Sequence, residues 1–292
     1  MGNVPLALLT KFDPWRSKLC TCPPKLTFNP YTGCDHACVY CYASSYIPKF
    51  FNCRPKKDLI SRLKKEAAKL NGEIISISNS SDPYPTIEAG KALTRQCLEI
   101  LSRSRCKVQI ITKSTLVIRD VDLLGKIPSM VSLTITTDED NLSKILEPHA
   151  PPSSERLKTV ERLVEAGIPT TVRIDPIIPH VNDNPQSLVE KLASIGVKQI
   201  TCSTYKVKMD NWQRINLALP EITEKLKPLY FEKGERIGRY LYLPRELRLK
   251  LMENLAFMAK KYGLRFSVCR EGFSHLNTAV CDGSWLLKAE IG

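Results

Sequence analysis

Three cysteines stand close together near the start of the chain, in the sequence NPYTGCDHACVYCYA (29–43). Cys34, Cys38 and Cys41 follow the spacing C-x₃-C-x₂-C, and no fourth cysteine follows at a similar interval. A structural zinc ion usually takes four ligands in two pairs, and a ferredoxin-type 4Fe–4S cluster uses four cysteines. Three thiolates on such a cluster would leave one iron open to a substrate or cofactor. A zinc or redox site is the alternative for the same residues.

Four more cysteines lie near the two ends of the chain. Cys20 and Cys22 precede the first group, and Cys269 and Cys281 lie close to the C-terminus. If the end segments approach each other in the fold, their thiolates could hold zinc or an auxiliary iron–sulfur cluster. C-x-C is an unusual spacing for zinc, and four unrelated thiols are the alternative interpretation.

The bulk composition narrows the class of protein. The 292 residues have a hydrophobic content of 43% and a formal net charge of +13. This surplus favours polyanionic partners, nucleic acid above all, although a Lys-rich surface gives the same surplus. No apolar run has the length of a membrane span, and the N-terminus is too short and broken for a signal peptide. We therefore expect a cytoplasmic protein without a membrane partner, whose cysteines stay mostly reduced.

Apolar segments rich in β-branched residues alternate with segments of helical periodicity. Strands are expected at 25–33, 72–78, 107–114, 130–136, 169–179 and 197–207, and helices at 86–103, 154–168 and 185–196. This alternation predicts βαβ units and a parallel sheet. We predict an α/β fold in which six parallel strands form a partial (β/α)₆ barrel of the TIM type. The three cysteines follow the first strand, at the end of the barrel where such folds carry their chemistry.

Beyond residue 207 the pattern changes. The sequence is irregular up to about residue 243, and a helix at 244–263 and a short strand at 264–268 follow. We expect an N-terminal segment at 1–26, the barrel at 27–207, and an α-rich C-terminal extension at 208–292 that packs on it.

The cysteine spacing with Tyr40 as an aromatic residue before the third cysteine resembles the C-x₃-C-x-Φ-C motif of the radical S-adenosylmethionine (radical SAM) superfamily. The surrounding sequence resembles, more narrowly, the spore photoproduct lyase-like (DNA repair photolyase-like) branch. The resemblance runs in order over residues 27–206, through SDPYPTIE (81–88), ITKSTLVIRDVDLL (111–124), SLTITTDEDNLSKILEPHAPPSSERL (132–157) and AGIPTTVRIDPIIPHVND (166–183).

This resemblance implies a 4Fe–4S cluster bound by the three cysteines of the motif. S-adenosylmethionine would bind the open iron through its amino and carboxylate groups, and an electron from the cluster would release a 5′-deoxyadenosyl radical. A donor such as flavodoxin or ferredoxin would supply that electron.

The resemblance also implies which residues contact the cofactor. By position, Tyr40 would lie beside the adenine, and Thr134 would lie near the ribose. Ser80, Ser81 and Asp82 would lie near the methionine part, with Lys113 and Ser114 near its carboxylate. Arg173 and Asp175 would form a charged pair under the cofactor. Capping of strand ends is the alternative for the Ser and Thr residues, and a structural ion pair is the alternative for Arg173 and Asp175.

One position departs from the lyase itself. Spore photoproduct lyase has a hydrogen-donating cysteine at the end of its second strand, where this chain has Asn79. The chain is therefore not expected to be a true spore photoproduct lyase. Cys202, with Tyr205 three positions on, is the candidate replacement donor. A small buried core residue is the alternative for Cys202.

The sequence leaves the substrate open. The segment 45–69 mixes Lys and Arg with Tyr46, Phe50 and Phe51, which suits phosphate contact and base stacking. We expect a nucleic-acid substrate, either a DNA lesion or a tRNA base. The alternatives are a peptide or small molecule attacked by the same radical, and a nucleic-acid-binding iron–sulfur redox sensor without turnover.

Overall fold

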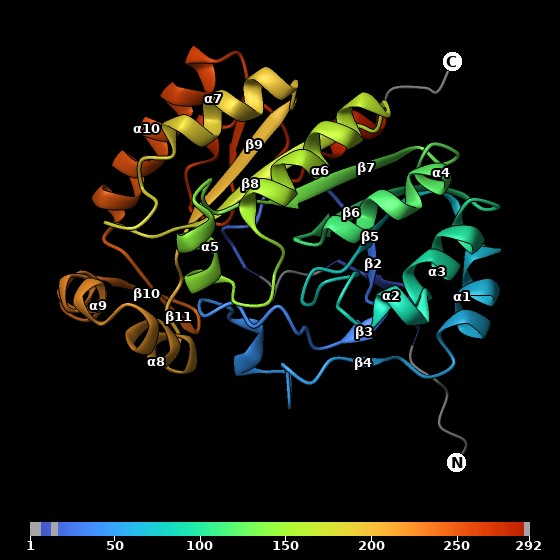
Figure 1. Ribbon diagram of the computed structural model, residues 1–292, viewed down its shortest axis with the longest axis horizontal. Helices are drawn as coiled ribbons and strands as arrows, with labels where there is room; N and C mark the ends of the chain where they lie inside the picture. Colours follow the sequence, from blue (N-terminus) through green and yellow to red (C-terminus); the bar gives the residue numbers. More distant parts are fainter. Residues whose placement is uncertain (1–6, 13–16, 289–292) are drawn as a thin grey trace.

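The computed structural model describes residues 7–12 and 17–288, and a single eight-stranded sheet forms its centre (Figure 1). The strands lie in the order β1 (Thr10–Lys11), β2 (Leu26–Phe28), β5 (Asn71–Ile77), β6 (Arg105–Thr112), β7 (Ser129–Thr134), β8 (Thr170–Ile177), β9 (Gln199–Thr204) and β12 (Arg265–Val268). Neighbours from β2 to β12 pair in parallel, and β1 pairs with β2 in antiparallel orientation. The predicted α/β fold with six parallel strands up to residue 207 is confirmed, and the sheet is an open, partial barrel.

Helices follow the strands and cover one face of the sheet (Figure 1). They are α1 (Leu59–Ala67), α2 (Glu88–Lys91), α3 (Leu93–Leu101), α4 (Val121–Leu124), α5 (Asp140–Leu146), α6 (Ser153–Glu165), α7 (Gln186–Ile195) and α10 (Arg245–Lys261). Each of the longer ones buries an apolar stripe, such as Leu63 of α1, Leu98 of α3 and Leu163 of α6. The single helix expected at 86–103 is divided, because Ala92 has a left-handed backbone with φ 49°.

The segment 208–243 is not irregular, which corrects the expectation from its sequence. It forms α8 (Met209–Ala218), α9 (Pro220–Lys227), the π-helical turn η3 (Pro228–Glu232) and a hairpin of β10 (Glu235–Ile237) and β11 (Tyr240–Tyr242). Ile215 and Leu226 anchor the two helices in the core, and Pro220 starts the second one. In Figure 1, α8 lies beside the blue segment that follows β3 (Tyr31–Thr32).

The C-terminal segment crosses the sheet and satisfies buried polar side chains. Gln109 of β6 donates to the carbonyl of Asp282 at 2.6 Å, and Thr201 of β9 donates to that of Cys281 at 2.9 Å. Gly283 sits against Met130 of β7 with φ +78°. Since β12 also extends the sheet, the extension is part of the same hydrophobic core. The boundaries at residues 26 and 207 stay predictions.

Within residues 7–12 and 17–288, no helix is long and apolar enough to cross a lipid bilayer.

Candidate functional site

The carboxyl ends of the parallel strands surround a cavity of about 260 Å³. This cavity brings together most of the residues that the sequence singled out. Those that line it are Cys34, Cys38, Tyr40, Cys41, Ser80, Ser81, Asp82, Lys113, Thr134, Arg173, Asp175 and Tyr205. Residues of the cysteine loop and residues at the ends of β5 to β9 therefore line the same cavity. This is expected for a partial barrel, in which the site lies at the carboxyl ends of the strands.

The three thiols of the cysteine loop are shielded from solvent. Cys34 and Cys38 are buried, and Cys41 is half-buried. Burial raises the pKa of all three thiols, and it raises the pKa of Cys38 to about 12 although Lys113 opposes this effect. A buried thiol holds its proton unless a cation compensates the thiolate. Three such thiols around one cavity fit a cationic iron cluster better than a solvent-exposed reactive cysteine.

A glycine allows the chain to enter the loop. Gly33 has φ +82°, and a Cβ added there would collide with the carbonyl oxygen of Phe50, which accepts the Cys34 amide at 2.8 Å. The antiparallel pair of β3 and β4 (Arg54–Pro55) brings the two segments together at this point. The position of Cys34 therefore depends on the absence of a side chain at residue 33.

The variant Gly33→Ala is expected to displace Cys34 and to lower the iron content of reconstituted protein. The left-handed backbone alone costs about 1–2 kcal/mol for a residue with a Cβ, and the collision with Phe50 adds to it. Iron per chain and the melting temperature are the measurements. Gly72→Ala is the matched control, because Gly72 also has positive φ but nothing within 4 Å of an added Cβ. Equal iron content in the two variants would contradict the prediction.

Helix α8 holds the cysteine loop from one side. Arg214 donates to the carbonyls of Val39 at 3.2 Å and Cys41 at 2.7 Å, and Asn211 donates to the carbonyl of Tyr40 at 3.1 Å. The short helix η1 (Ala43–Ser45) joins this contact, where Ser44 donates to Asp210 at 2.7 Å. These residues were not anticipated from the sequence, where only their spacing along one helical face marks them.

The segment after α5 holds the loop from another side. Val39 donates its amide to the carbonyl of Leu146 at 2.9 Å, and the Tyr40 hydroxyl donates to the Glu147 carboxylate. Glu147 is 1% exposed, and Arg156 contacts its Oε2 at 2.5 Å. The loop is therefore fixed by backbone and side-chain contacts that come from distant parts of the chain.

Glu147 also connects the loop to Lys113. The Lys113 ammonium lies 3.9 Å from Oε1 of Glu147 and 5.5 Å from the centre of the Tyr40 ring. Burial opposes the charge on Glu147, but Arg156 and Lys113 hold its pKa below the usual range. The result is a buried carboxylate that fixes an aromatic ring and a cation at the cavity wall. The sequence analysis did not single out Glu147.

Asp82 organises the ends of β5 and β6. It accepts from the Thr112 hydroxyl at 2.7 Å, the Tyr84 amide at 2.9 Å and the Lys113 amide at 2.8 Å. Both of its oxygens are thus occupied within the chain. Its side chain shapes the cavity wall by fixing the backbone at Lys113.

Arg173 and Asp175 form a charged pair at 2.6 Å on β8, on the cavity side. Ser203 donates to Asp175 at 2.5 Å. Burial alone would raise the pKa of Asp175, but Arg173 and Lys206 hold it below the usual value. Lys206, which pairs with Glu271 at 2.9 Å, also lines the cavity and was not anticipated from the sequence.

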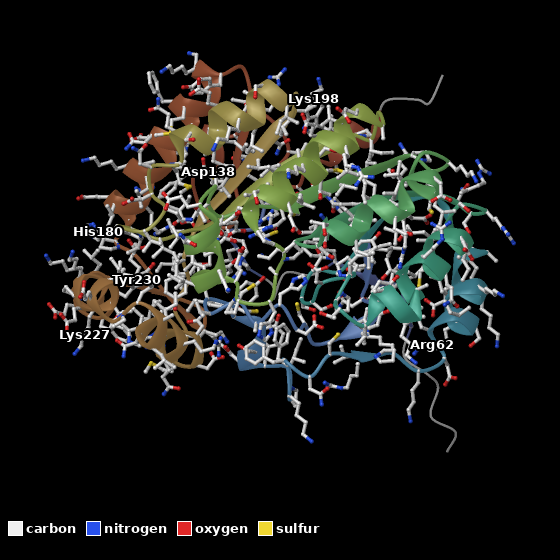
Figure 2. All side chains as sticks on the ribbon, in the orientation of Figure 1. Arg62, Asp138, His180, Lys198, Lys227 and Tyr230 are labelled. Atoms are coloured by element: carbon white, nitrogen blue, oxygen red, sulfur yellow. The ribbon has the colours of Figure 1, made fainter. Side chains whose placement is uncertain are left out.

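Two predicted residues, Ser114 and Cys202, lie outside the described cavity lining, and a third, Tyr205, lines the cavity with its hydroxyl already engaged. Ser114 is absent from the described cavity lining, and its hydroxyl accepts from the Leu116 amide at 3.3 Å at the start of η2 (Thr115–Asp120). Cys202 is fully buried in the core and does not line the described cavity either. Tyr205 lines it, but its hydroxyl donates to Asn211 at 2.7 Å. The hydroxyl of Tyr230, which is labelled in Figure 2, donates to the Tyr205 carbonyl at 2.8 Å.

The variant Cys202→Ala is expected to keep in full the cleavage of S-adenosylmethionine and the product formation that the family resemblance implies. Cys202 lacks the exposure that a hydrogen donor needs, and burial raises the pKa of its thiol. Release of 5′-deoxyadenosine and product yield, each per iron cluster, are the measurements. If the variant still cleaves the cofactor but forms no product, Cys202 is the hydrogen donor.

The spare cysteines do approach each other. Cys20, Cys22 and Cys269 line the cavity, and Cys281 lies with its sulfur 3.3 Å from that of Cys22. Among the described residues, no group of three or more His, Cys, Asp or Glu side chains is arranged around a metal ion, and this holds for Cys34, Cys38 and Cys41 as well. The auxiliary site at the spare cysteines therefore stays a prediction.

Comparison with protein-family models decides the family. Residues 28–192 match the radical SAM superfamily. The chain belongs to the radical SAM superfamily. A radical SAM protein is expected to hold a 4Fe–4S cluster and S-adenosylmethionine, and the two buried thiols and one half-buried thiol beside the cavity fit that cluster.

The chain is also similar to individual proteins and to solved structures. An uncharacterized protein of Methanocaldococcus jannaschii is 38% identical over 54% of this chain and 62% of its own length, so the chain spans less than two thirds of that relative. An uncharacterized protein of Acidianus two-tailed virus is 31% identical over 72% of this chain and 76% of its own length. Spore photoproduct lyase complexed with dinucleoside spore photoproduct superposes with a TM-score of 0.67 over 91% of this chain and 80% of that chain. At 16% identity, this last likeness concerns the fold.

Proposed function

We propose that this radical SAM protein cleaves S-adenosylmethionine reductively and uses the 5′-deoxyadenosyl radical to abstract a hydrogen atom from a nucleic acid. The observation that carries the proposal is the placement of Cys34, Cys38 and Cys41 beside one cavity at the carboxyl ends of parallel strands. The cluster would supply the electron for cleavage, delivered by a flavodoxin or ferredoxin.

The chain's own residues bind and orient the cofactor in this proposal. Lys113 offers a cation for the carboxylate of S-adenosylmethionine, and the Tyr40 ring beside it offers a face for the adenine. Thr134, Ser80 and Ser81 supply polar groups along the same wall. Arg173 and Asp175 form an ion pair that lies under the cofactor in this proposal. The half-enclosed cavity limits access of water to the reacting atoms.

Reduction of reconstituted protein in the presence of S-adenosylmethionine tests the radical chemistry. The expected product is 5′-deoxyadenosine, detected by chromatography. Cofactor that stays intact after the cluster is reduced would overturn the enzymatic proposal and favour a redox sensor that binds nucleic acid without turnover.

The choice of nucleic acid rests on charge and on exposed aromatic rings near the cysteine loop. The chain carries a formal net charge of +13. Tyr46 is 38% exposed and Phe51 is 40% exposed, whereas Phe50 is buried. Lys208 lies 5.8 Å from the Tyr46 ring centre, and Arg214 lies 5.2 Å from that of Phe51. Such pairs can stack on bases and contact phosphates.

Binding to nucleic acid is expected to weaken steeply as salt increases. If about four phosphates are contacted, the affinity should fall on the order of 10²-fold between about 50 and 200 mM salt. Fluorescence anisotropy with a labelled DNA duplex and a labelled tRNA measures this slope. Affinity that is independent of salt would remove the electrostatic support and favour a peptide or a small molecule as the substrate. DNA or RNA that copurifies with the protein would support the nucleic acid.

A further inference from the structure

A thiol pair joins the two ends of the chain at the edge of the cavity. Cys22 lies shortly before β2, and Cys281 lies in the segment that crosses the sheet. Their sulfur atoms are 3.3 Å apart although the residues are 259 positions apart in sequence. Cys22 lines the cavity, so a small reagent that enters the cavity can reach it.

The backbone around the pair is held in place on both sides. Lys25, three residues after Cys22, is buried and pairs with Asp282 at 2.5 Å, directly after Cys281. The carbonyl of Cys281 accepts from Thr201 at 2.9 Å. A buried ion pair therefore fixes the two segments next to each other, and the approach of the sulfur atoms follows from that register.

The arrangement suits two-electron thiol chemistry. A disulfide needs two sulfur atoms about 2.05 Å apart, with suitable side-chain torsions. From 3.3 Å this distance is within reach of small rotations of two side chains.

A third thiol adjoins the pair. A hydrogen bond from Cys22 lowers the pKa of Cys20 to about 6, and a hydrogen bond from Cys22 also lowers the pKa of Cys281. The same two hydrogen bonds raise the pKa of Cys22, so Cys22 is the proton donor of the group. Thiolates are the attacking species in thiol–disulfide exchange. The group therefore contains both an accessible sulfur and a neighbour able to attack it.

We propose that Cys22 and Cys281 form a reversible disulfide on the wall of the cavity, with a low-molecular-weight disulfide such as oxidised glutathione as the oxidant. The Cys20 thiolate takes the proton of Cys22, and the Cys22 sulfur attacks one sulfur of the oxidant, which gives a mixed disulfide and releases one molecule of glutathione, to which that proton passes. Cys281 then attacks the Cys22 sulfur, forms the protein disulfide and releases the second glutathione. Two electrons and two protons thus pass from the two protein thiols to two molecules of glutathione. The bond makes a covalent connection between the N-terminal segment and the segment that crosses the sheet.

The test uses the full chain with its cluster, equilibrated without oxygen at increasing ratios of oxidised to reduced glutathione. Free thiols are then alkylated, and linked peptides are identified by mass spectrometry without reduction. The expected result is a Cys22–Cys281 link that increases with the ratio and disappears after dithiothreitol. Iron content should stay constant, because the ligand thiols are shielded.

Two variants and a metal assay sharpen the result. Cys22→Ser should abolish the link, whereas Cys53→Ser, which removes another half-buried thiol, should leave it unchanged. Oxidised wild-type protein should melt several degrees above oxidised Cys22→Ser, and the reduced forms should melt together. The absence of the link at every ratio would overturn the proposal. So would zinc bound at one ion per chain that protects these thiols until a chelator removes it. Neither result depends on cleavage of S-adenosylmethionine, so the radical chemistry is judged separately.

Discussion

Protein in which Cys38 is replaced by alanine is expected to contain almost no cluster and to release no 5′-deoxyadenosine above background. Cys38 is buried in the middle of the cysteine loop and lines the cavity with Cys34 and Cys41. The variant has two ligand thiols left in the loop. A 4Fe–4S cluster usually has four cysteine ligands, so a cluster bound by three is expected to be lost when one of them is removed. Because the family reaction needs the electron from this cluster, the whole activity should be lost.

The measurements are iron and sulfide per chain after anaerobic reconstitution, together with the yield of 5′-deoxyadenosine. Wild-type protein should bind about four irons per chain, as a single 4Fe–4S cluster requires. Cys97→Ala is the matched control, since Cys97 is a fully buried thiol on α3 away from the described cavity lining. Full iron and full cleavage in Cys38→Ala would show that the loop does not bind the cluster.

The cysteine loop and the strand ends could be predicted because their signals are local. The spacing of Cys34, Cys38 and Cys41 lies within eight residues, and the resemblance to the radical SAM superfamily singled out Lys113 and Arg173 on two of the expected parallel strands. A parallel sheet aligns the carboxyl ends of its strands. The local motif, the family resemblance and this rule for parallel sheets together identify most of the residues that line the cavity.

The side to which Cys202 points is visible in the sequence of its strand. Although all six residues of β9 are buried, polar Gln199, Thr201 and Ser203 alternate with Ile200 and Cys202. Ser203 faces Asp175 and the cavity, and its neighbour Cys202 therefore points the other way. This alternation favours the core position, which was the alternative for Cys202.

The contacts that hold the loop could not be predicted from the sequence. Arg214 reaches Cys41 across 173 positions, and Glu147 reaches Tyr40 across 107. A single sequence contains no information about which of many Arg and Glu residues become partners after folding. Only the folded chain identifies Glu147 as buried, since its neighbours His149 and Pro148 give no apolar pattern around it.

Replacement of Glu147 by glutamine is expected to lower stability and to weaken the binding of S-adenosylmethionine. The variant keeps the size of the side chain but removes a buried negative charge from beside Arg156 and Lys113. Loss of one partner of a buried ion pair typically costs about 3–5 kcal/mol, because the other charge stays buried. The Tyr40 ring and the Lys113 ammonium also lose the group that orients them.

Thermal unfolding and calorimetric titration with S-adenosylmethionine measure the two effects separately. Glu155→Gln is the matched control, because Glu155 is exposed on α6 and such changes usually stay within about 0.5 kcal/mol. Tyr40→Phe removes only the hydroxyl that donates to Glu147, so it loosens the ring without leaving a charge unpaired. Wild-type affinity for S-adenosylmethionine in both Glu147→Gln and Tyr40→Phe would show that Glu147 has a structural role alone.

The dependence on pH adds a check with a definite sign. Arg156 and Lys113 hold the pKa of Glu147 below its ordinary value of 4.5 in the folded chain. A carboxylate whose pKa is lowered by folding stabilises the protein above the pKa of the unfolded chain, and this stabilisation is lost as the pH falls through the folded pKa. The difference in melting temperature between wild type and Glu147→Gln should therefore be full at neutral pH and should shrink below about pH 4.5. A difference that stays constant or grows under acid conditions would mean that the charge of Glu147 is not the source of its stabilising effect.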